Sequence, residues 1–421
     1  MDITPPNVSP VKVLGRPAEQ GRWLLIPLGM MILLCLGTVY SWSIFRTPLE
    51  KELSITATQS LLPFTFALVF YAATMPIAGF YIPRIGTRLT TAIGGVVVGL
   101  GYILSSFANQ IGVLVLTYGV IAGVGVGIAY GVPMVVAARW FPEKKGLAVG
   151  LTVLGFGLSP FVTAPLANHL IRTYTATPTL RILGMAFIAI IAVLSLTMKL
   201  PPKDWHPRRD CATAHQIKLQ TYPKNIFKSQ SFYGLWICYA IATLVGLSAI
   251  GISSPVGEEI IQINPTMAAS SVSLFAIFNG VSRPLFGWLS DRFKPQHVAI
   301  FSYVLILIAC IVMIHAQAGQ VAGYLIAFSL FWFCLGGWLA MAPTITLHFF
   351  DPDHYAQNYG IIFTAYGVGA LIGTLVTGRI RDLFGTYNYV FYPMALLAII
   401  GIVVCSLFLK RESAAVDPVI H

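Results

Sequence analysis

Long apolar stretches, separated by short polar ones, run through this chain of 421 residues. Each stretch is long enough for an α-helix that crosses the hydrocarbon core of a bilayer, which takes roughly 20 residues. The pattern predicts twelve such helices in two sets of six. The first set is Trp23–Phe45, Leu61–Ile82, Leu89–Phe107, Ile111–Val136, Gly146–Ile171 and Ile182–Leu200. The second set is Phe232–Pro255, Ala268–Leu289, Val298–Ile314, Val321–Leu347, Tyr359–Thr377 and Tyr389–Leu409.

The polar stretches divide the chain into five predicted parts. A polar tail, residues 1–21, precedes the N-terminal bundle of six helices, residues 22–200. A basic linker, residues 201–231, leads to the C-terminal bundle, residues 232–409, and a short tail follows at residues 410–421. The predicted fold class is therefore an all-α membrane protein with twelve transmembrane helices, because only helices and closed barrels satisfy their backbone hydrogen bonds in lipid.

Composition agrees with a membrane protein and argues against a soluble one. Hydrophobic residues make up 57% of the chain and charged residues only 10%. The mean hydropathy is +0.79. One soluble core cannot bury this much apolar surface, so the expected surroundings are a lipid bilayer.

The net charge of +11 is distributed in a way that disfavours a nucleic-acid partner. Of the 26 lysines and arginines, nineteen fall in the tails, in the linker, in the loops on their side or, for Lys199, at the helix end beside the linker, and six fall in the loops opposite. The remaining one, Arg283, lies inside a predicted helix. Because basic residues concentrate in cytoplasmic loops, we expect a multi-pass protein of the cell (inner) membrane with both termini in the cytoplasm.

Motifs for catalysis, metal binding or cofactor binding are missing from the sequence. The six cysteines show no paired spacing, and five of them lie in apolar segments, where packing is the expected role. There is no phosphate-binding loop, zinc motif or catalytic serine context. We therefore expect no enzyme, no metal and no cofactor. The short tails disfavour a receptor with a signalling domain, and no obligatory protein partner is evident.

The two sets of six helices repeat each other. Duplicated six-helix halves that hold a substrate between them near the middle of the membrane are a known transporter architecture. Two separate stretches carry the repeat at nearly the same shift. A shift of 208 residues aligns Pro76 with Pro284, Gly79 with Gly287 and Arg84 with Arg292, and a shift of 210 aligns Pro133 with Pro343, Gly150 with Gly360 and Gly157 with Gly367.

One arginine interrupts the eighth predicted helix. Arg283 lies between the apolar runs Val272–Phe278 and Pro284–Leu289. A guanidinium at a helix centre costs roughly 2.5 to 3.5 kcal/mol on insertion scales and usually faces a bundle interior or a wet cavity. Since no aspartate or glutamate lies well inside a predicted helix, the simplest counter-ion is an anionic ligand. The alternative, an arginine that snorkels or pairs with backbone carbonyls, suits helix ends better.

The chemistry of Arg283 favours a ligand with one carboxylate. A guanidinium binds a carboxylate through two parallel hydrogen bonds and keeps its charge. The repeat places Met75 at the matching position, so the first half offers no second cation there. Asn279 lies one helical turn before Arg283, where it either bonds the ligand or holds the guanidinium. Further candidates, each with ordinary structural hydrogen bonding as an equal alternative, are the hydroxyls of Tyr40, Tyr130 and Tyr366.

The stretches "GFYIPRIGTR" and "GWLSDRFKPQ", which end the second and eighth helices, resemble the loop signature of the major facilitator superfamily. The resemblance implies two pseudo-symmetric six-helix bundles and a charge network at the helix ends that acts as a conformational switch. In the first copy Pro83 stands at the acidic position, so the network is expected to depend mainly on the second copy. The residues that the resemblance assigns to the switch are Gly79, Arg84, Gly287, Asp291 and Arg292.

A narrower resemblance concerns the substrate. The stretch "RWFPEKKGLAVGLTVLGFG", residues 139–157, resembles the fifth-helix signature of monocarboxylate transporters and of bacterial oxalate and formate exchangers. "FNGVSRPLFGWLSDR" is similar to their eighth helix, whose arginine binds the substrate carboxylate. Where dicarboxylate exchangers carry a lysine in helix eleven, this sequence has Tyr366. Where the animal carriers have an aspartate that is a plausible proton carrier, it has Asn279.

These features together predict a secondary active transporter of small monocarboxylates such as lactate or pyruvate. The family resemblance implies proton-coupled symport by alternating access, although no acid inside a predicted helix stands out as the proton carrier. Carboxylate exchange of the oxalate/formate type is the alternative. The expected partners are a small monocarboxylate anion, a proton and the lipid bilayer. The expected substrate-binding residues are Arg283, Asn279, Tyr130, Tyr40 and Tyr366.

Overall fold

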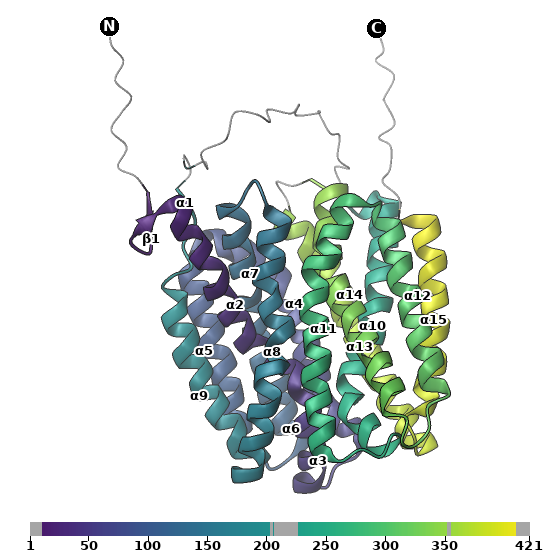
Figure 1. Cartoon of the computed structure of the whole chain (residues 1–421). Helices are drawn as coiled ribbons and strands as arrows, with labels where there is room; N and C mark the ends of the chain where they lie inside the picture. The colour runs from purple at the N-terminus through teal and green to yellow at the C-terminus, as the bar shows by residue number, and fades with distance from the viewer. Residues whose placement is uncertain (1–10, 203–204, 206–225, 352–354, 410–421) are drawn as a thin grey trace, which may run out of the picture.

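The computed structural model describes residues 11–202, 205, 226–351 and 355–409, and most of these residues are helical (Figure 1). The N-terminal half contains α1 (Ala18–Gly21), α2 (Leu25–Leu36), α3 (Trp42–Leu53), α4 (Ala57–Ile85), α5 (Thr87–Ser105), α6 (Ile111–Leu114), α7 (Gly123–Trp140), α8 (Lys145–Tyr174) and α9 (Ala176–Ser195). The C-terminal half contains α10 (Gln230–Glu259), α11 (Pro265–Arg292), α12 (Pro295–Ile314), α13 (Val321–Phe349), α14 (Tyr355–Phe384) and α15 (Phe391–Phe408).

Twelve helical units in the described residues are long and apolar enough to cross a membrane, and each overlaps one of the predicted apolar segments. The twelve-helix prediction is therefore confirmed. Two of the spans are composite. A 3₁₀ segment, η2 (Gly37–Ser41), joins α2 to α3, and a π-helical segment, η3 (Val115–Ala122), joins α6 to α7.

Most observed helices extend beyond the predicted apolar cores. The eleventh span was predicted at Tyr359–Thr377, whereas α14 runs from Tyr355 to Phe384. Polar turns continue a helix wherever its backbone hydrogen bonds are available, and hydropathy alone does not register them. A capping box formed by Thr56 and Gln59 starts α4 in the same way, outside the apolar run.

The polar N-terminal tail contains secondary structure, about which the sequence made no prediction. Strands β1 (Lys12–Val13) and β2 (Arg16–Pro17) form a short antiparallel hairpin that leads into α1. The hairpin folds because the side chain of Val13 is buried and the amide of Ala18 donates to the carbonyl of Val11 at 2.9 Å. Most of the predicted linker and the C-terminal tail lie outside the described residues.

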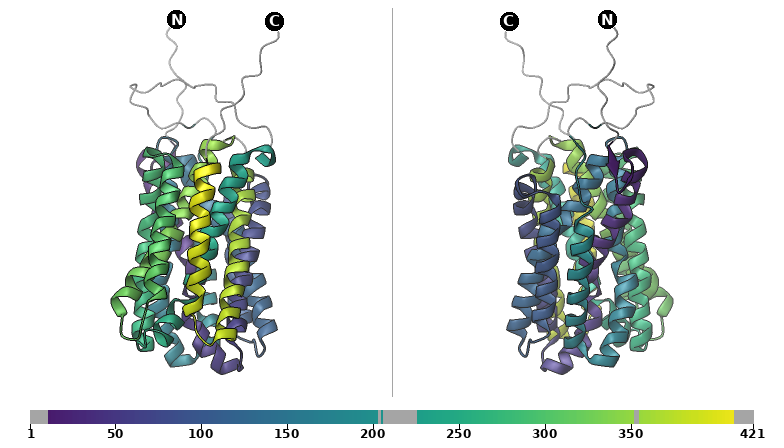
Figure 2. Two further views of the ribbon diagram at one scale, coloured as in Figure 1. Left: turned by 90° about the vertical axis from the view of Figure 1, so that its right-hand side faces the viewer. Right: turned by 90° about the vertical axis from the view of Figure 1, so that its left-hand side faces the viewer.

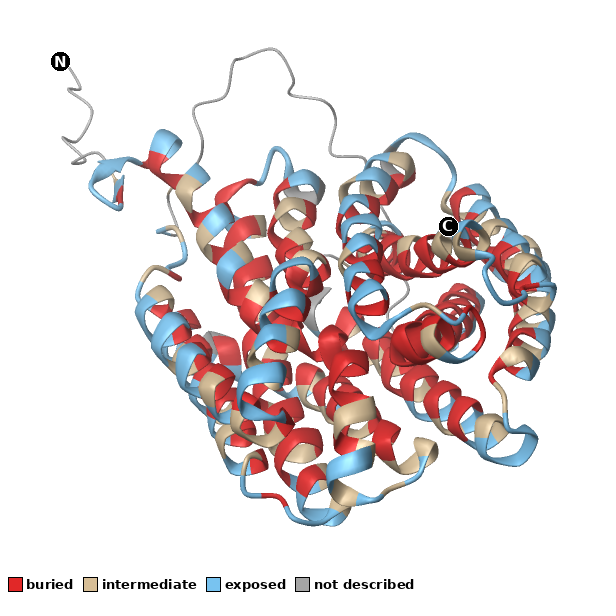
Figure 3. Ribbon diagram, turned by 60° about the horizontal axis from the view of Figure 1, so that its bottom comes forward, coloured by how far each residue is buried: buried red, intermediate tan, exposed pale blue. Residues whose placement is uncertain are grey.

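The two six-helix bundles stand side by side, as Figure 1 and the two side views of Figure 2 show. We call the end that contains α1 and the start of α2 the tail end, and the end that contains the loop between α3 and α4 the far end. Large apolar side chains such as Leu100, Val193 and Ile326 are exposed on the outer surfaces, while buried residues gather inside each bundle and between the bundles (Figure 3). An apolar outer surface of this kind fits lipid rather than water.

Equivalent positions of the repeat meet across the two bundles. Gly360 on α14 packs against Pro76 on α4, and Gly150 on α8 packs against Pro284 on α11. These are the prolines and glycines that the two sequence shifts align. The pseudo-symmetry of the bundles therefore extends to their contacts. The contacts differ in tightness: a Cβ atom on Gly360 would lie 2.9 Å from the Cα of Pro76, whereas one on Gly150 would lie 3.7 Å from the Cα of Pro284.

This difference predicts opposite effects of one methyl group. Gly360→Ala forces the α14 backbone away from α4 and should destabilise the purified protein by about 1–3 kcal/mol, the usual cost of overpacking. Gly150→Ala places its methyl group at ordinary contact distance and should be neutral or stabilising by up to about 1 kcal/mol through helix propensity. Thermal unfolding in detergent measures both changes, and equal effects of the two substitutions would contradict the packing described above.

Candidate functional site

A cavity of about 330 Å³ lies between the two bundles. All its lining residues come from the tail-end halves of α4, α7, α8, α11, α13 and α14, so the cavity occupies the tail side of the molecule. Its wall is mainly apolar, with residues such as Met75, Val149 and Leu347, and it contains the two arginines Arg139 and Arg283. The volume is within the range of small-molecule pockets, roughly 300 to 1,000 Å³.

Arg283 lies on α11 and lines this cavity, with its side chain fully buried. Its Nη1 donates to the carbonyl oxygen of Val153 on α8 at 3.1 Å, and its Nη2 donates to Oδ1 of Asn279 at 3.0 Å. The Nε atom has no hydrogen-bond partner among the described residues. The side chain therefore does not snorkel: it bridges the two bundles through one backbone carbonyl and keeps one donor unpaired.

Asn279 holds the Arg283 guanidinium in this conformation. Its Nδ2 donates to the carbonyl oxygen of Trp332 at 2.8 Å, and its Oδ1 accepts from Arg283, so both ends of the amide are engaged. Gly157 on α8 faces the same place, because a Cβ atom there would lie 2.8 Å from Nε of Arg283. The sequence analysis assigned Gly157 only to the repeat. Its position within the fifth-helix signature was the available signal for a role at the site.

The three predicted tyrosines surround Arg283 from both bundles. The hydroxyls of Tyr40, on η2, and Tyr366, on α14, share a hydrogen bond of 2.9 Å across the bundles. Tyr40 and Tyr130 both interact electrostatically with the Arg283 guanidinium. The ring of Tyr71, which the sequence analysis did not single out, lies 5.0 Å from that of Tyr130 and 5.5 Å from that of Tyr366.

The residues assigned to the switch lie toward the tail end. Gly79 and Gly287 line the cavity on opposite bundles, and a Cβ atom on Gly287 would meet no atom within 4 Å. Arg84 and Arg292 are exposed and form no ion pair within the described part of the chain, and Arg292 lies 4.9 Å from the ring centre of Trp288. Asp291 belongs to the last turn of α11, but its side chain lies outside what the structure describes.

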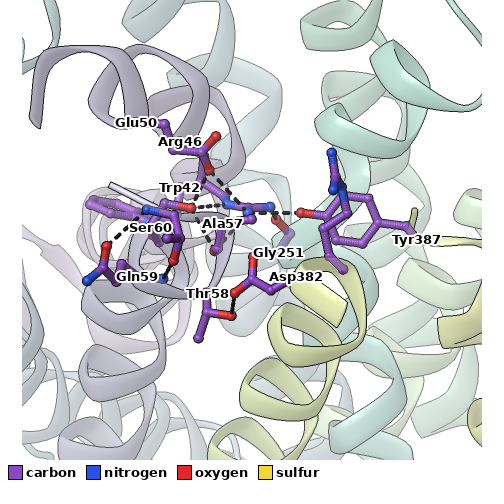
Figure 4. Close-up of polar contacts among 12 residues, drawn as sticks. Trp42, Arg46, Glu50, Ala57, Thr58, Gln59, Ser60, Gly251, Asp382 and Tyr387 are labelled. Atoms are coloured by element: carbon purple, nitrogen blue, oxygen red, sulfur yellow. Dashed lines mark hydrogen bonds and ion pairs between the residues drawn. The ribbon is translucent and has the colours of Figure 1, made fainter. Parts of the chain in front are cut away.

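A second buried arginine, which the sequence analysis missed, lies near the far end. The sequence assigned Arg46 to a loop, yet it belongs to α3 and is only 1% exposed. It remains charged and buried because acceptors from both bundles surround it (Figure 4). Its donors bind Ser60 Oγ at 2.9 Å, the carbonyl of Gly251 at 3.0 Å, the Tyr387 hydroxyl at 3.0 Å, the carbonyl of Ala57 at 3.1 Å and the Glu50 carboxylate at 3.3 Å.

Two further polar contacts join the bundles at the far end, and the repeat relates them. Thr58 on α4 donates to the carboxylate of Asp382 on α14, as Figure 4 shows. At the equivalent place, Arg172 on α8 donates to the hydroxyl of Thr266 on α11. The shifts of 208 and 210 residues relate Thr58 to Thr266 and Arg172 to Asp382. The bundles are therefore held together at the far end, while the cavity lies toward the tail end.

Twelve membrane helices in two pseudo-symmetric bundles, with a central cavity between them, define a secondary transporter fold. The chain belongs to the Major Facilitator Superfamily, whose family model matches residues 28–260 and 235–419. A bacterial homologue of the human lysosomal transporter Spinster, solved in an inward-facing and unoccupied conformation, has the same fold. It matches with a TM-score of 0.68 at 16% identity, over 94% of this chain and 99% of that one.

Curated relatives agree with the resemblance found in the sequence. The oxalate:formate antiporter of Oxalobacter formigenes is 25% identical over 95% of this chain and 94% of its own length. Monocarboxylate transporter 14 of Mus musculus is 25% identical over 78% of each chain. An uncharacterised MFS-type transporter of Escherichia coli is 26% identical over 84% of this chain and 87% of its own. The protein is thus a multi-pass membrane transporter and not an enzyme.

The hydrogen bonds of Arg46 to Gly251 and Tyr387 on the other bundle are expected to stabilise the closed far end. Burial raises the pKa of the Tyr387 phenol and the Arg46 guanidinium only partly opposes this, so the hydroxyl stays protonated at neutral pH. Tyr387→Phe removes a hydrogen bond between the bundles and should increase the fraction of molecules open at the far end about fivefold, since such a bond contributes about 1 kcal/mol. Spin labels at Thr173 and Leu383, on opposite bundles, measure the opening. The exposed Tyr389 supplies the control Tyr389→Phe, and equal distance distributions for the two variants would contradict the role of Tyr387.

Proposed function

We propose that this protein transports small monocarboxylates of the lactate and pyruvate type by alternating access, with a proton as the coupled ion. The observation that carries the proposal is the buried Arg283 guanidinium, which lines a cavity whose described lining contains no carboxylate. A buried charge without an acidic partner needs a counter-ion, and an anionic substrate supplies it.

The contacts of Arg283 suggest how substrate binding is coupled to movement. Its bond to the Val153 carbonyl joins α11 of one bundle to α8 of the other. A carboxylate that takes Nε and the neighbouring Nη2 side by side draws the guanidinium away from this carbonyl. Binding therefore exchanges a contact between the bundles for one with the substrate, and the bundles become free to rock. Asn279 keeps its bond to α13 through the Trp332 carbonyl and holds the guanidinium in place during the exchange.

The surroundings of Arg283 favour one carboxylate over two. Met75 lines the cavity at the position that the repeat relates to Arg283, so no cation stands there. Position 366 holds a tyrosine and not a cation, and its hydroxyl shares a hydrogen bond with Tyr40. The substrate thus meets one positive charge with tyrosine hydroxyls beside it. Tyr40, Tyr130 and Tyr366 are proposed to bond the second carboxylate oxygen or a hydroxyl or oxo group of the substrate.

The proposed orientation places the tail end in the cytoplasm of the cell and the protein in its inner membrane. Exposed basic residues at the tail end support this orientation through the positive-inside rule. The cavity then faces inward, and the far-end contacts form the closed outer side. Gly79 and Gly287 in the cavity wall, with Arg84, Asp291 and Arg292 at the helix ends, are proposed to form the conformational switch.

Transport by substituted carriers tests the role of Arg283. Arg283→Lys keeps the charge but loses the planar fork, so saturable uptake of labelled lactate into proteoliposomes should fall at least tenfold. Arg16→Lys changes an exposed arginine outside the cavity, serves as the control and should transport normally. Uptake should be inhibited by pyruvate, acetate and formate more strongly than by oxalate. Full activity of the lysine variant would contradict recognition through two hydrogen bonds, and preferred oxalate would contradict the one-charge argument.

Carboxylate exchange remains the second candidate. One observation in its favour is the relative named an oxalate:formate antiporter, which is 25% identical. The other is Asn279, which stands where a proton-carrying aspartate would be expected for symport.

A pH gradient separates the two couplings. For symport, acidifying the outside of empty proteoliposomes should stimulate lactate uptake several-fold, because protons bind the carrier from that side. For exchange, preloaded lactate should stimulate uptake and the pH gradient should not. Protein-free liposomes correct for diffusion of the undissociated acid. Stimulation by preloaded anion alone would replace symport by exchange without affecting the carboxylate site.

A further inference from the structure

A second arginine lines the transport cavity without a role in the site around Arg283. Arg139 lies in the last turn of α7 and is exposed. The sequence analysis placed it in a loop on the basic side of the membrane. The structure instead places it in the cavity wall, on the bundle opposite to Arg283.

The charge of Arg139 is not neutralised within the described residues, where it forms no hydrogen bond or ion pair. The nearest acid along the chain, Glu143, binds Nη1 of Arg22 at 2.6 Å instead. The described cavity lining contains no aspartate or glutamate. The cavity is therefore an apolar-walled space with a cation at its inner limit and a second cation nearer the tail end.

Helix geometry separates the two cations along the membrane normal. Tyr130, which interacts with Arg283, and Arg139 both belong to α7. Nine residues separate them, so Arg139 lies about 13 Å further toward the tail end at 1.5 Å per residue. This separation is too long for the two carboxylates of oxalate to reach both arginines. Arg139 is thus a separate position on the route and not a second contact for the same bound anion.

We propose that Arg139 forms a second carboxylate-binding station at the tail-end mouth of the cavity, which receives the substrate from Arg283 and captures it in the reverse direction. The inference rests on the proposed carboxylate transport. Arg283 binds its anion in a nearly dry place, where release is slow unless another cation attracts the anion. Arg139 provides that attraction on the way out.

Electrostatic focusing gives the station its effect. A cleft that is lined by charges of one sign and has walls of low dielectric constant raises the local concentration of the opposite ion. The Arg139 guanidinium is exposed to solvent, so at 0.1 M ionic strength salt largely screens its attraction for an anion beyond about 10 Å. Binding from the tail-end side should therefore depend on Arg139 and on salt, whereas binding from the far-end side should not.

The test compares the two faces of the membrane. Initial rates of labelled lactate uptake are measured in right-side-out and inverted membrane vesicles, with a tag after His421 to identify the tail-end face. Arg139→Gln should raise the KM for lactate from the tail-end face about fivefold, the upper range for an exposed ion pair. The KM from the far-end face should change less than twofold. Arg139→Lys should restore the wild-type value, since a point charge is sufficient at an exposed station.

Two controls separate this effect from a structural one. Arg16→Gln removes an exposed tail-end arginine that does not line the cavity, and its KM should match that of the wild type on both faces. Raising the salt concentration should raise the tail-end KM of the wild type toward that of Arg139→Gln and should leave the variant unchanged. Two outcomes would overturn the station and leave the proposed function intact. Arg139→Gln would change the KM equally on both faces, or it would change neither KM while the wild type transports lactate. A wild type without saturable carboxylate uptake would overturn both.

Discussion

A guanidinium that leaves water must regain its hydrogen bonds inside the protein, and Arg46 and Arg283 meet this requirement in different ways. Arg46 obtains acceptors from five residues and is fully occupied, whereas Arg283 obtains two and keeps Nε unpaired. Both arginines draw acceptors from the opposite bundle. The need to solvate two buried charges therefore ties the halves together at the far end and at the level of the cavity.

The repeat supplies a symmetric framework on which asymmetric chemistry is placed. Pro76 and Pro284 meet Gly360 and Gly150 in equivalent contacts, and Thr58 and Thr266 bind the other bundle at equivalent points. The packing positions are thus shared between the halves. The position of Met75 and Arg283 is not shared: one half places an apolar side chain there and the other a cation, as the proposed binding of a single anion at this level requires.

The sequence predicted the twelve helices and singled out Arg283 inside one of them, since long apolar runs and an isolated charge are strong local signals. It did not predict the state of Arg46, which follows an apolar run and looks like a loop residue, because its acceptors at Gly251 and Tyr387 are distant in the chain. The sequence assigned Arg139 to a loop and not to the cavity wall, because charge patterning indicates a side of the membrane and not the direction of a side chain. The contact of Gly157 with Arg283 depends on how two helices from different bundles pack, which no local pattern contains.

The unpaired Nε of Arg283 has a consequence for selectivity among anions. A buried donor without an acceptor raises the free energy of the empty site by about 1–3 kcal/mol. An anion that supplies the acceptor recovers this amount on binding. A halide ion has no fixed pair of acceptors to match adjacent donors, whereas the two oxygens of a carboxylate lie in one plane and match the edge of the guanidinium. Any side chain at position 157 would block that edge, because a Cβ atom there would lie 2.8 Å from Nε. If Arg283 binds the substrate as proposed, the empty site is biased toward planar oxyanions over chloride.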